Sequence, residues 1–237
     1  MPELPEVETV RKGLEDRLDN FYIDKVDVST ERTIASPGGS KEFIEMLCGS
    51  FIGSWQRRGK YLIASINKKV INRQSCPKKL KSSGWWGVHL RMTGYFQLHD
   101  KNIEPCPHTR VRLWNREGKE LRFVDIRNFG QMWWVPPKLA PEEIIKGLKK
   151  LGPEPFNKEF NPFYLENRLK NKTCSIKSAL LDQSVVAGTG NIYADESLFS
   201  AGILPTKQAG MLNQNELKVL CKSLVNILKI SIGEGGT

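Results

Sequence analysis

Apolar residues near the start of the chain recur at helical spacing. Four of them are three or four positions apart and would form one face of a helix; they are Val7, Val10, Leu14 and Leu18. Pro5 suits the first helical turn, and glutamates, which occur on both sides of it, are favoured at a helix N-terminus. The pattern therefore predicts an amphipathic helix over residues 3–19.

From residue 22 to residue 135 the pattern changes to short apolar segments, several of which alternate with polar residues and end at Gly, Asn or Pro. The segments are 22–28, 51–55, 61–66, 86–90, 95–98, 111–114, 121–124 and 131–135. Residues 115–118, Asn-Arg-Glu-Gly, suit a hairpin turn. Many short strands separated by turn signals predict a sandwich or a barrel.

Prolines punctuate the chain after residue 135, around one short helical stretch at residues 142–151. We therefore interpret residues 136–160 as a linker between a strand-rich domain, residues 1–135, and a second domain, residues 161–237.

The second domain is predicted to be helical. Asn161 can cap its first helix, and Pro162 can occupy the first turn. Further helices are predicted over residues 176–183, 192–201 and 213–232. The last is the clearest, because Leu217, Leu220 and Leu224 lie on one face of it.

The chain is strongly basic, with a formal net charge of +10 and a pI of about 9.4 over 237 residues. Residues 46–99 contain ten basic and no acidic residues. This imbalance favours a polyanionic partner, nucleic acid rather than membrane, and the alternative is a merely basic surface. Within residues 46–99, residues 68–81 resemble an insertion between two strands. They are equally well interpreted as a solvated basic loop.

The cysteines and the apolar runs restrict the class of protein. None of the five cysteines has Cys-x-x-Cys spacing, which argues against a disulfide framework and a four-cysteine zinc site. No apolar run reaches the roughly 18 residues of a membrane helix, and the acidic N-terminus lacks a secretory core. We therefore expect a cytoplasmic protein with no membrane partner and no metal site in these residues.

The N-terminus carries candidate chemistry. A proline in second place normally becomes the first residue once the initiator Met is removed, and its secondary amine can attack an anomeric carbon to form an iminium. Glu3 follows as an acid–base partner. Most Met-Pro starts have no catalytic meaning, so Pro2 alone would not support this hypothesis.

Six segments together resemble the formamidopyrimidine-DNA glycosylase family, and they occur in the family's order. They are PELPEVETV (2–10), QRRGKYL (56–62), HLRMTG (89–94), DIRNFG (125–130), LGPEP (151–155) and GTGNIYADE (188–196). They extend over nearly the whole chain. The first segment favours this branch over the endonuclease VIII-like relatives, which share the Pro-Glu start.

The resemblance implies an α+β fold: an N-terminal two-sheet β-sandwich with flanking helices, followed by a helix–two-turns–helix DNA-binding domain. It implies a monomeric, nucleoid-associated enzyme of base-excision repair that binds damaged double-stranded DNA. Such an enzyme is a glycosylase and an AP lyase, and it removes oxidised purines such as 8-oxoguanine and formamidopyrimidines.

The resemblance also implies catalytic roles. Pro2 would form the Schiff base with the deoxyribose, and Glu3 would act as the acid during sugar-ring opening. Lys60 would donate a proton during β-elimination and meet a phosphate; otherwise it is an ordinary surface lysine. Glu6 would assist the site, or would simply favour the helix dipole.

An enzyme that acts inside a duplex must extrude its target nucleotide and fill the gap. The resemblance assigns this wedge to Met92, Arg127 and Phe129, as a flexible apolar side chain, a cation and an aromatic ring. The alternative for Met92 and Phe129 is core packing. DNA contacts are implied for His108, Arg127, Lys172, Lys177 and Asn191, the last after a Gly-x-Gly turn where a helix begins.

Members of this family usually end in a four-cysteine zinc finger, which implies zinc as a cofactor, but the required cysteines are absent from these residues. We therefore expect either a fragment or a truncated gene product. Two alternatives stay open for its function. One is an endonuclease VIII-type glycosylase for oxidised pyrimidines, and the other is a catalytically inactive fragment that binds DNA.

Overall fold

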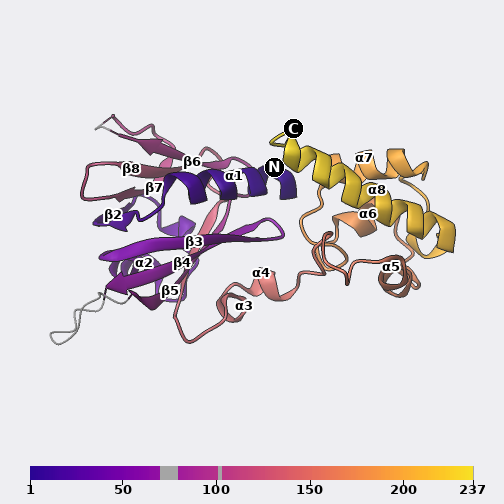
Figure 1. Ribbon diagram of the computed structural model, residues 1–237, viewed down its shortest axis with the longest axis horizontal. Helices are drawn as coiled ribbons and strands as arrows, with labels where there is room; N and C mark the ends of the chain where they lie inside the picture. Colours follow the sequence, from indigo (N-terminus) through magenta and orange to yellow (C-terminus); the bar gives the residue numbers. More distant parts are fainter. Residues whose placement is uncertain (70–79, 101–102, 237) are drawn as a thin grey trace. The chain divides into compact units, whose positions relative to one another are not determined.

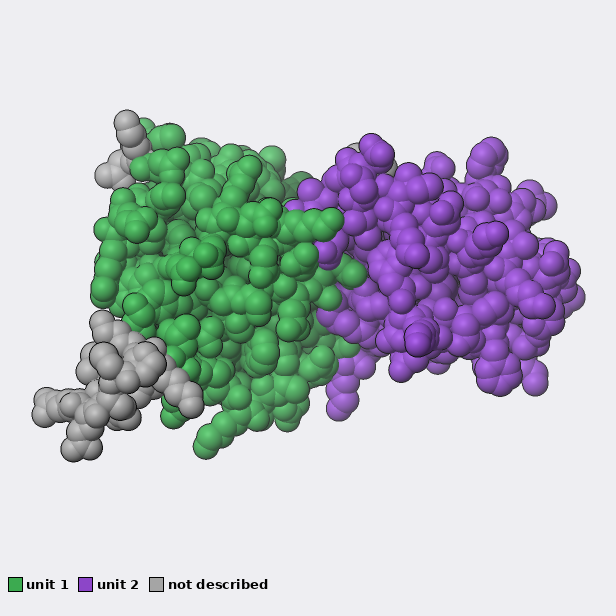
Figure 2. Space-filling model, in the orientation of Figure 1, with its two compact units in different colours: residues 1–2, 10–57, 61–148 green, residues 3–9, 58–60, 149–237 purple. Residues whose placement is uncertain are grey.

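The computed structural model describes residues 1–69, 80–100 and 103–236 (Figure 1). Contacts divide the chain into two compact units (Figure 2). Unit 1 comprises Met1–Pro2, Val10–Arg57 and Tyr61–Leu148, and unit 2 comprises Glu3–Thr9, Arg58–Lys60 and Lys149–Thr237. Two short segments from early in the sequence therefore belong to the unit formed by the last third of the chain. The division into residues 1–135, 136–160 and 161–237 stays a prediction.

Unit 1 is built on two sheets. The five-stranded sheet has the order β1 (Tyr22–Ile23), β3 (Ser50–Arg58), β4 (Tyr61–Lys69), β5 (Leu80–His89) and β9 (Gln131–Val135). The four-stranded sheet has the order β2 (Lys25–Val28), β7 (Thr109–Trp114), β8 (Glu120–Asp125) and β6 (Gly94–His99). β7 and β8 pair antiparallel across the turn predicted at residues 115–118.

Aromatic side chains from both sheets meet in the core of unit 1. Trp55 of β3 lies 5.3 Å from Trp86 of β5, between ring centroids, and Trp86 lies 6.0 Å from Phe96 of β6. Phe96 in turn contacts Phe123 of β8 at 5.3 Å. Because these rings join one sheet to the other, they confirm the predicted two-sheet sandwich.

The sandwich differs from the prediction in two places. Residues 22–28 do not form one strand: the chain leaves the first sheet after Ile23 and enters the second at Lys25, and the Asp24 N–H bonds the Trp114 carbonyl at 2.8 Å. The structure also contains two helices that the pattern did not predict, the 3-10 helix η1 (Glu31–Thr33) and α2 (Gly39–Leu47). α2 has two glycines at its start, and it buries Phe43 against Trp86.

The helical stretch predicted at residues 142–151 is wrong as a single helix. The structure has two four-residue helices, α3 (Pro141–Ile144) and α4 (Lys146–Lys149), separated at Ile145 where the backbone is non-helical. The helix predicted over residues 3–19 is confirmed as α1 (Leu4–Arg17). The proposed insertion at residues 68–81 lies largely outside the described residues, although its ends belong to β4 and β5.

The last third of the chain is helical, as predicted. Its elements are α5 (Pro162–Leu169), α6 (Ile176–Leu181), α7 (Asn191–Ala201), η2 (Ala209–Met211) and α8 (Gln214–Gly233). The Asn161 side chain accepts the Tyr164 N–H at 2.9 Å, which confirms the predicted cap. Asn213 and Glu216 form a reciprocal capping box at α8. No helix in the described ranges is long and apolar enough to cross a membrane.

Candidate active site

The N-terminal end of α7 binds a carboxylate from the start of the chain. Glu3 is 4% exposed, and its carboxylate accepts the N–H groups of Gly190 (2.9 Å), Ile192 (3.2 Å) and Tyr193 (3.4 Å). The free N–H groups and the positive end of a helix favour an anion at this position. Glu3 is therefore held at a defined position by residues 187 or more places later in the sequence.

Gly190 permits this close approach. A Cβ at position 190 would lie 2.3 Å from the Glu3 carboxyl carbon, which is far inside van der Waals contact. The turn before it is braced by Gln183, whose side chain accepts the Gly188 N–H (2.9 Å) and donates to the Thr189 carbonyl (2.8 Å). The second glycine of the Gly-Thr-Gly-Asn motif therefore makes room for Glu3.

Glu6 forms the second contact between α1 and α7. One oxygen of its carboxylate accepts the Glu3 N–H at 2.8 Å, and the other accepts the Tyr193 hydroxyl at 2.5 Å. The Glu3 N–H belongs to the peptide that joins Pro2 to Glu3. The two carboxylates at the start of α1 are thus both anchored on the first turn of α7.

Lys60 lies at the tip of the hairpin that β3 and β4 form. Gly59 occupies the left-handed region at φ 56°, which a turn requires and glycine adopts without strain. Glu154 fixes the turn, because its carboxylate accepts the Gly59 N–H at 2.6 Å and pairs with Arg58 at 3.1 Å. Arg58 also donates to the carbonyls of Leu151 and Gly152. Arg58 is thus bound within the protein and is not presented to a ligand.

The Lys60 side chain is buried, at 6% exposure. Burial lowers the pKa of its amine, although the carboxylates of Glu3 and Glu6 act in the opposite direction. Lys60, Glu3 and Glu6 all belong to unit 2. A lysine with a lowered pKa near two carboxylates can exchange a proton more readily than a surface lysine.

Pro2 is half-buried and is joined by one peptide bond to the anchored Glu3. Met1 is 50% exposed, so the residue that blocks the Pro2 nitrogen is accessible for removal. Sequence reasoning identified Pro2, Glu3 and Lys60, but it assigned no role to Tyr193 or Glu154. Both lie within motifs of the family resemblance, which was the only available signal for them.

The three predicted wedge residues lie on the surface of unit 1. Met92 is 40% and Phe129 is 39% exposed, so core packing is not their environment. The Arg127 guanidinium lies over the Phe129 ring at 4.9 Å, and the Arg32 guanidinium also contacts that ring at 5.6 Å. A hollow of about 340 Å³ beside them is lined by Met92, Phe129, Arg32 and Arg91, among others. Sequence reasoning missed Arg32.

The other predicted DNA-contacting residues are distributed over both units. Asn191 is exposed as the first residue of α7, and His108 is exposed ahead of β7. Lys172 and Lys177 each pair with a carboxylate, Asp182 at 3.0 Å and Asp195 at 2.8 Å. These partly exposed pairs are weak, so each lysine can exchange its carboxylate for a phosphate at little cost.

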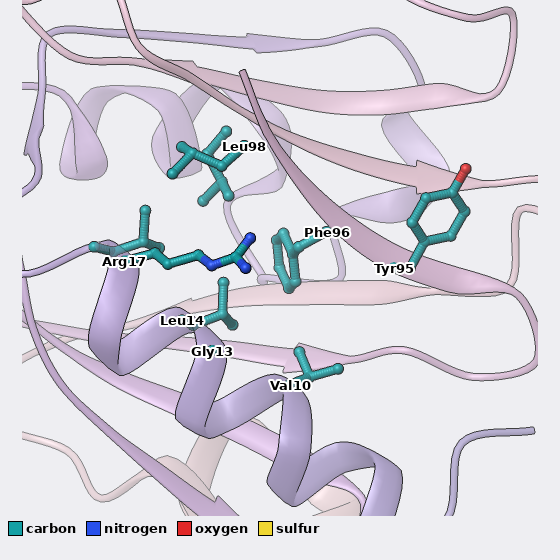
Figure 3. Close-up of a pocket in the computed structure, with 9 residues that line it drawn as sticks. Val10, Gly13, Leu14, Arg17, Tyr95, Phe96 and Leu98 are labelled. Atoms are coloured by element: carbon teal, nitrogen blue, oxygen red, sulfur yellow. The ribbon is translucent and has the colours of Figure 1, made fainter. Parts of the chain in front are cut away.

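A second hollow of unit 1 lacks catalytic groups. A pocket of about 160 Å³ lies between α1 and β6. Leu14, Phe96 and Leu98 are among the residues that line it (Figure 3). Arg17 is the one charged residue of its lining, which contains no carboxylate. Nothing in this pocket suggests chemistry.

The described residues do not fit a zinc site. No group of three or more His, Cys, Asp or Glu side chains in these ranges could hold a metal ion. The described cysteines Cys48, Cys106, Cys174 and Cys221 are all free thiols.

Comparison with known families gives two matches that together cover most of the chain. The formamidopyrimidine-DNA glycosylase N-terminal domain matches residues 1–132, and the formamidopyrimidine-DNA glycosylase H2TH domain matches residues 151–237. Proteins named formamidopyrimidine-DNA glycosylase from Prochlorococcus marinus are 61% identical (strain MIT 9313) and 64% identical (strain MIT 9211). Both alignments cover 100% of this chain and 81% of the relative.

Solved structures agree with these matches. The Lactococcus lactis formamidopyrimidine-DNA glycosylase, non-covalently bound to DNA containing an AP site, superimposes with a TM-score of 0.86 at 32% identity. That alignment covers 99% of this chain and 83% of the other. MutM in complex with DNA containing carbocyclic 8-oxo-G gives a TM-score of 0.87 at 32% identity, covering 100% and 81% of the two chains.

Proposed function

Since the chain belongs to the formamidopyrimidine-DNA glycosylase family, we propose that Pro2, Glu3 and Lys60 carry its chemistry. The protein is a DNA glycosylase of base-excision repair that acts on damaged DNA. The observation that supports this assignment most directly is the anchoring of Glu3 on the N-terminus of α7, which fixes the residue that follows the nucleophile. We assign 8-oxoguanine and formamidopyrimidines as the preferred bases.

The Pro2 nitrogen attacks C1′ of the damaged nucleotide, and the glycosidic bond breaks with its electron pair leaving on the base. The attacking nitrogen then loses its proton to Glu3. Glu3 passes this proton to the ring oxygen O4′ as the C1′–O4′ bond breaks, which leaves an iminium between Pro2 and C1′. The hydrogen bonds from Gly190 and Ile192 hold the Glu3 carboxylate in place for both transfers.

β-Elimination follows from the iminium. Water takes a proton from C2′, and the C3′–O3′ bond breaks with its electron pair on the 3′ phosphate. Lys60 donates its proton to the departing phosphate oxygen. Its buried position and its lowered pKa suit a proton donor, because a less basic amine gives up its proton more readily. The wedge of Met92, Arg127 and Phe129 fills the space from which the nucleotide was extruded.

His108, Asn191, Lys172 and Lys177 bind DNA phosphates and position the duplex, without reading its sequence. We further propose that the protein works as a monomer in the cytoplasm, in association with the nucleoid. Zinc is typical of the family, but the described residues of this chain do not fit it.

Borohydride trapping on a duplex with one 8-oxoguanine tests the chemistry. We expect a covalent adduct that disappears when Pro2 is blocked by an added N-terminal residue. A matched variant is Pro5→Ala, because it replaces another proline only three residues away, in the first turn of α1, and leaves the terminal amine free. Loss of trapping in the blocked chain alone would support the assignment of Pro2.

The same experiment separates the alternatives. A duplex with an oxidised pyrimidine replaces the 8-oxoguanine duplex in a parallel reaction. Faster trapping on the pyrimidine would assign the endonuclease VIII-type specificity instead. Salt-sensitive DNA binding with no adduct on either lesion would identify a DNA-binding chain without this activity.

A further inference from the structure

Tyr193 contacts both carboxylates at the start of α1. It is 1% exposed, its backbone N–H donates to Glu3, and its hydroxyl donates to Glu6 at 2.5 Å. Its position is rigid, because it belongs to the first turn of α7 and its carbonyl accepts the Ser197 hydroxyl. Tyr193 is therefore a fixed reference point for the N-terminal residues of the chain.

The second carboxylate oxygen of Glu6 connects Tyr193 to the Pro2–Glu3 peptide. It accepts the Glu3 N–H at 2.8 Å, and that N–H lies in the plane of the Pro2–Glu3 peptide. Fixing the plane leaves rotation about the Pro2 Cα–C bond as the main freedom of the terminal amine. On this basis we propose that Tyr193 is a positioning residue, which orients the Pro2 amine through Glu6.

The hydroxyl is the part of Tyr193 that this role needs. Phenylalanine would keep the ring, its burial and the backbone N–H to Glu3, but it would remove the hydrogen bond to Glu6. Glu6 could then turn, and the Pro2–Glu3 peptide would sample further orientations. Misplacement of a reacting atom by about 1 Å can cost on the order of 100-fold in rate. A partial loss of order should therefore slow the attack by about tenfold.

The inference rests on the proposed role of Pro2, and single-turnover trapping at an abasic site tests it. We expect Tyr193→Phe to trap about tenfold more slowly, with unchanged affinity for a duplex containing a tetrahydrofuran site. Tyr164→Phe is the matched control, because it removes another tyrosine hydrogen bond in unit 2, to the Val185 carbonyl at 2.9 Å. Equal rates in Tyr193→Phe and Tyr164→Phe would overturn the inference.

A double-mutant cycle shows whether the effect passes through Glu6. In a Glu6→Ala background, Tyr193→Phe should change the trapping rate less than about twofold, since the side chain that joins Tyr193 to the Glu3 N–H is already gone. Full additivity of the two substitutions would overturn the proposed route. Absence of any adduct in the parent chain would instead contradict the proposed function, so the two failures are distinguishable.

A measurement on the free chain needs no activity. The Glu3 amide proton should exchange with solvent more slowly than a free amide, because Glu6 accepts it. In selectively 15N-glutamate-labelled protein, Tyr193→Phe should speed exchange of the Glu3 amide and shift its resonance, whereas Tyr164→Phe should not. An unchanged Glu3 amide in Tyr193→Phe would contradict the inference even if trapping slowed.

Discussion

Single hydrogen bonds at the start of α1 decide what the first residues can do. Glu3 and Glu6 are three places apart, and their roles differ because their partners differ. Glu3 is held by backbone N–H groups of α7, whereas Glu6 joins a tyrosine hydroxyl to the Glu3 N–H. The hydrogen bonds of Glu3 come from backbone groups, which a side-chain substitution does not remove. A steric substitution is therefore the suitable test of its position.

Gly190→Ala provides that steric test. The new Cβ would overlap the Glu3 carboxyl carbon, whereas the backbone at φ −130° is open to alanine. We expect borohydride trapping to fall by about tenfold or more while duplex binding is kept. Gly13→Ala in α1 is the control, since nothing lies within 4 Å of its new Cβ. If Gly190→Ala trapped as fast as the parent chain, the position of Glu3 would be unimportant for trapping.

Lys60→Ala separates the two chemical steps. Without the proton donor, strand cleavage at a preformed abasic site should fall by about 100-fold or more, whereas borohydride trapping should fall much less. In the parent chain, cleavage should also decline as pH rises through the lowered pKa of Lys60, because only the protonated amine can donate. Gel assays that resolve nicked and trapped products, run from pH 6 to pH 10, measure strand cleavage and borohydride trapping. Equal loss of cleavage and trapping would remove the assigned role.

At the scale of elements, loops and helix ends carry the candidate site. The α7 N-terminus binds Glu3, the β3–β4 turn carries Lys60, and the loop after β8 carries Arg127 and Phe129. In that last loop Asn128 has φ 55°, and its side chain accepts the Thr33 hydroxyl of η1 at 3.3 Å. A short helix that the hydrophobic pattern does not show thus supports the wedge loop.

Met92→Ala tests the wedge. Filling the gap matters most when an intact stack has to be opened, so base excision from a duplex should fall by several-fold or more. Binding to an abasic or pre-nicked site should change little, because the stack is already open there. Tyr95→Ala removes a side chain of similar exposure, 41% against 40%, and serves as the control. Equal losses on open and intact sites would contradict the assignment.

The sequence was informative where one local rule decided the structure. Helical spacing predicted α1, Asn161 predicted the cap of α5, and the turn residues predicted the β7–β8 hairpin. It failed where tertiary contacts decided, as at Asp24, where the chain changes sheets, and at Ile145, where a helix is interrupted. For the candidate site, the sequence alone identified Pro2, Glu3 and Lys60 as candidate catalytic residues. The pairing of Glu6 with Tyr193 could not be predicted, because no local pattern links positions that are 187 apart.

At the scale of the whole molecule, a buried ion cluster couples the stability of the sandwich to pH. Glu120 is 1% exposed and accepts hydrogen bonds from Arg122 at 2.7 Å and Arg112 at 2.6 Å. Burial alone would raise the pKa of Glu120, but the two arginines outweigh it and lower the pKa to about 2. The unfolded chain therefore binds a proton more readily than the folded one in acid.

Acid should for this reason weaken the fold. Above pH 4.5, the ionised Glu120 contributes a total of about 3 kcal/mol to the free energy of unfolding. This contribution is lost as the pH falls toward about 2. Urea unfolding from pH 7 to pH 2.5 measures it. Glu120→Gln should be less stable at pH 7 and should show a shallower decline. If the free energy of unfolding fell equally steeply with pH in Glu120→Gln and in the parent chain, groups other than Glu120 would cause the acid sensitivity.

The anchoring of Glu3 on α7 also sets an order of events during synthesis. The two partners are separated by 187 positions, so at 5–20 residues per second the ribosome takes about 10–40 s to add the second after the first. Throughout that interval the nascent N-terminus has no α7 to dock on, and it is open to the peptidase that removes Met1. The terminal amine is thus exposed while it is being processed, and it acquires its final surroundings only after α7 has been synthesised.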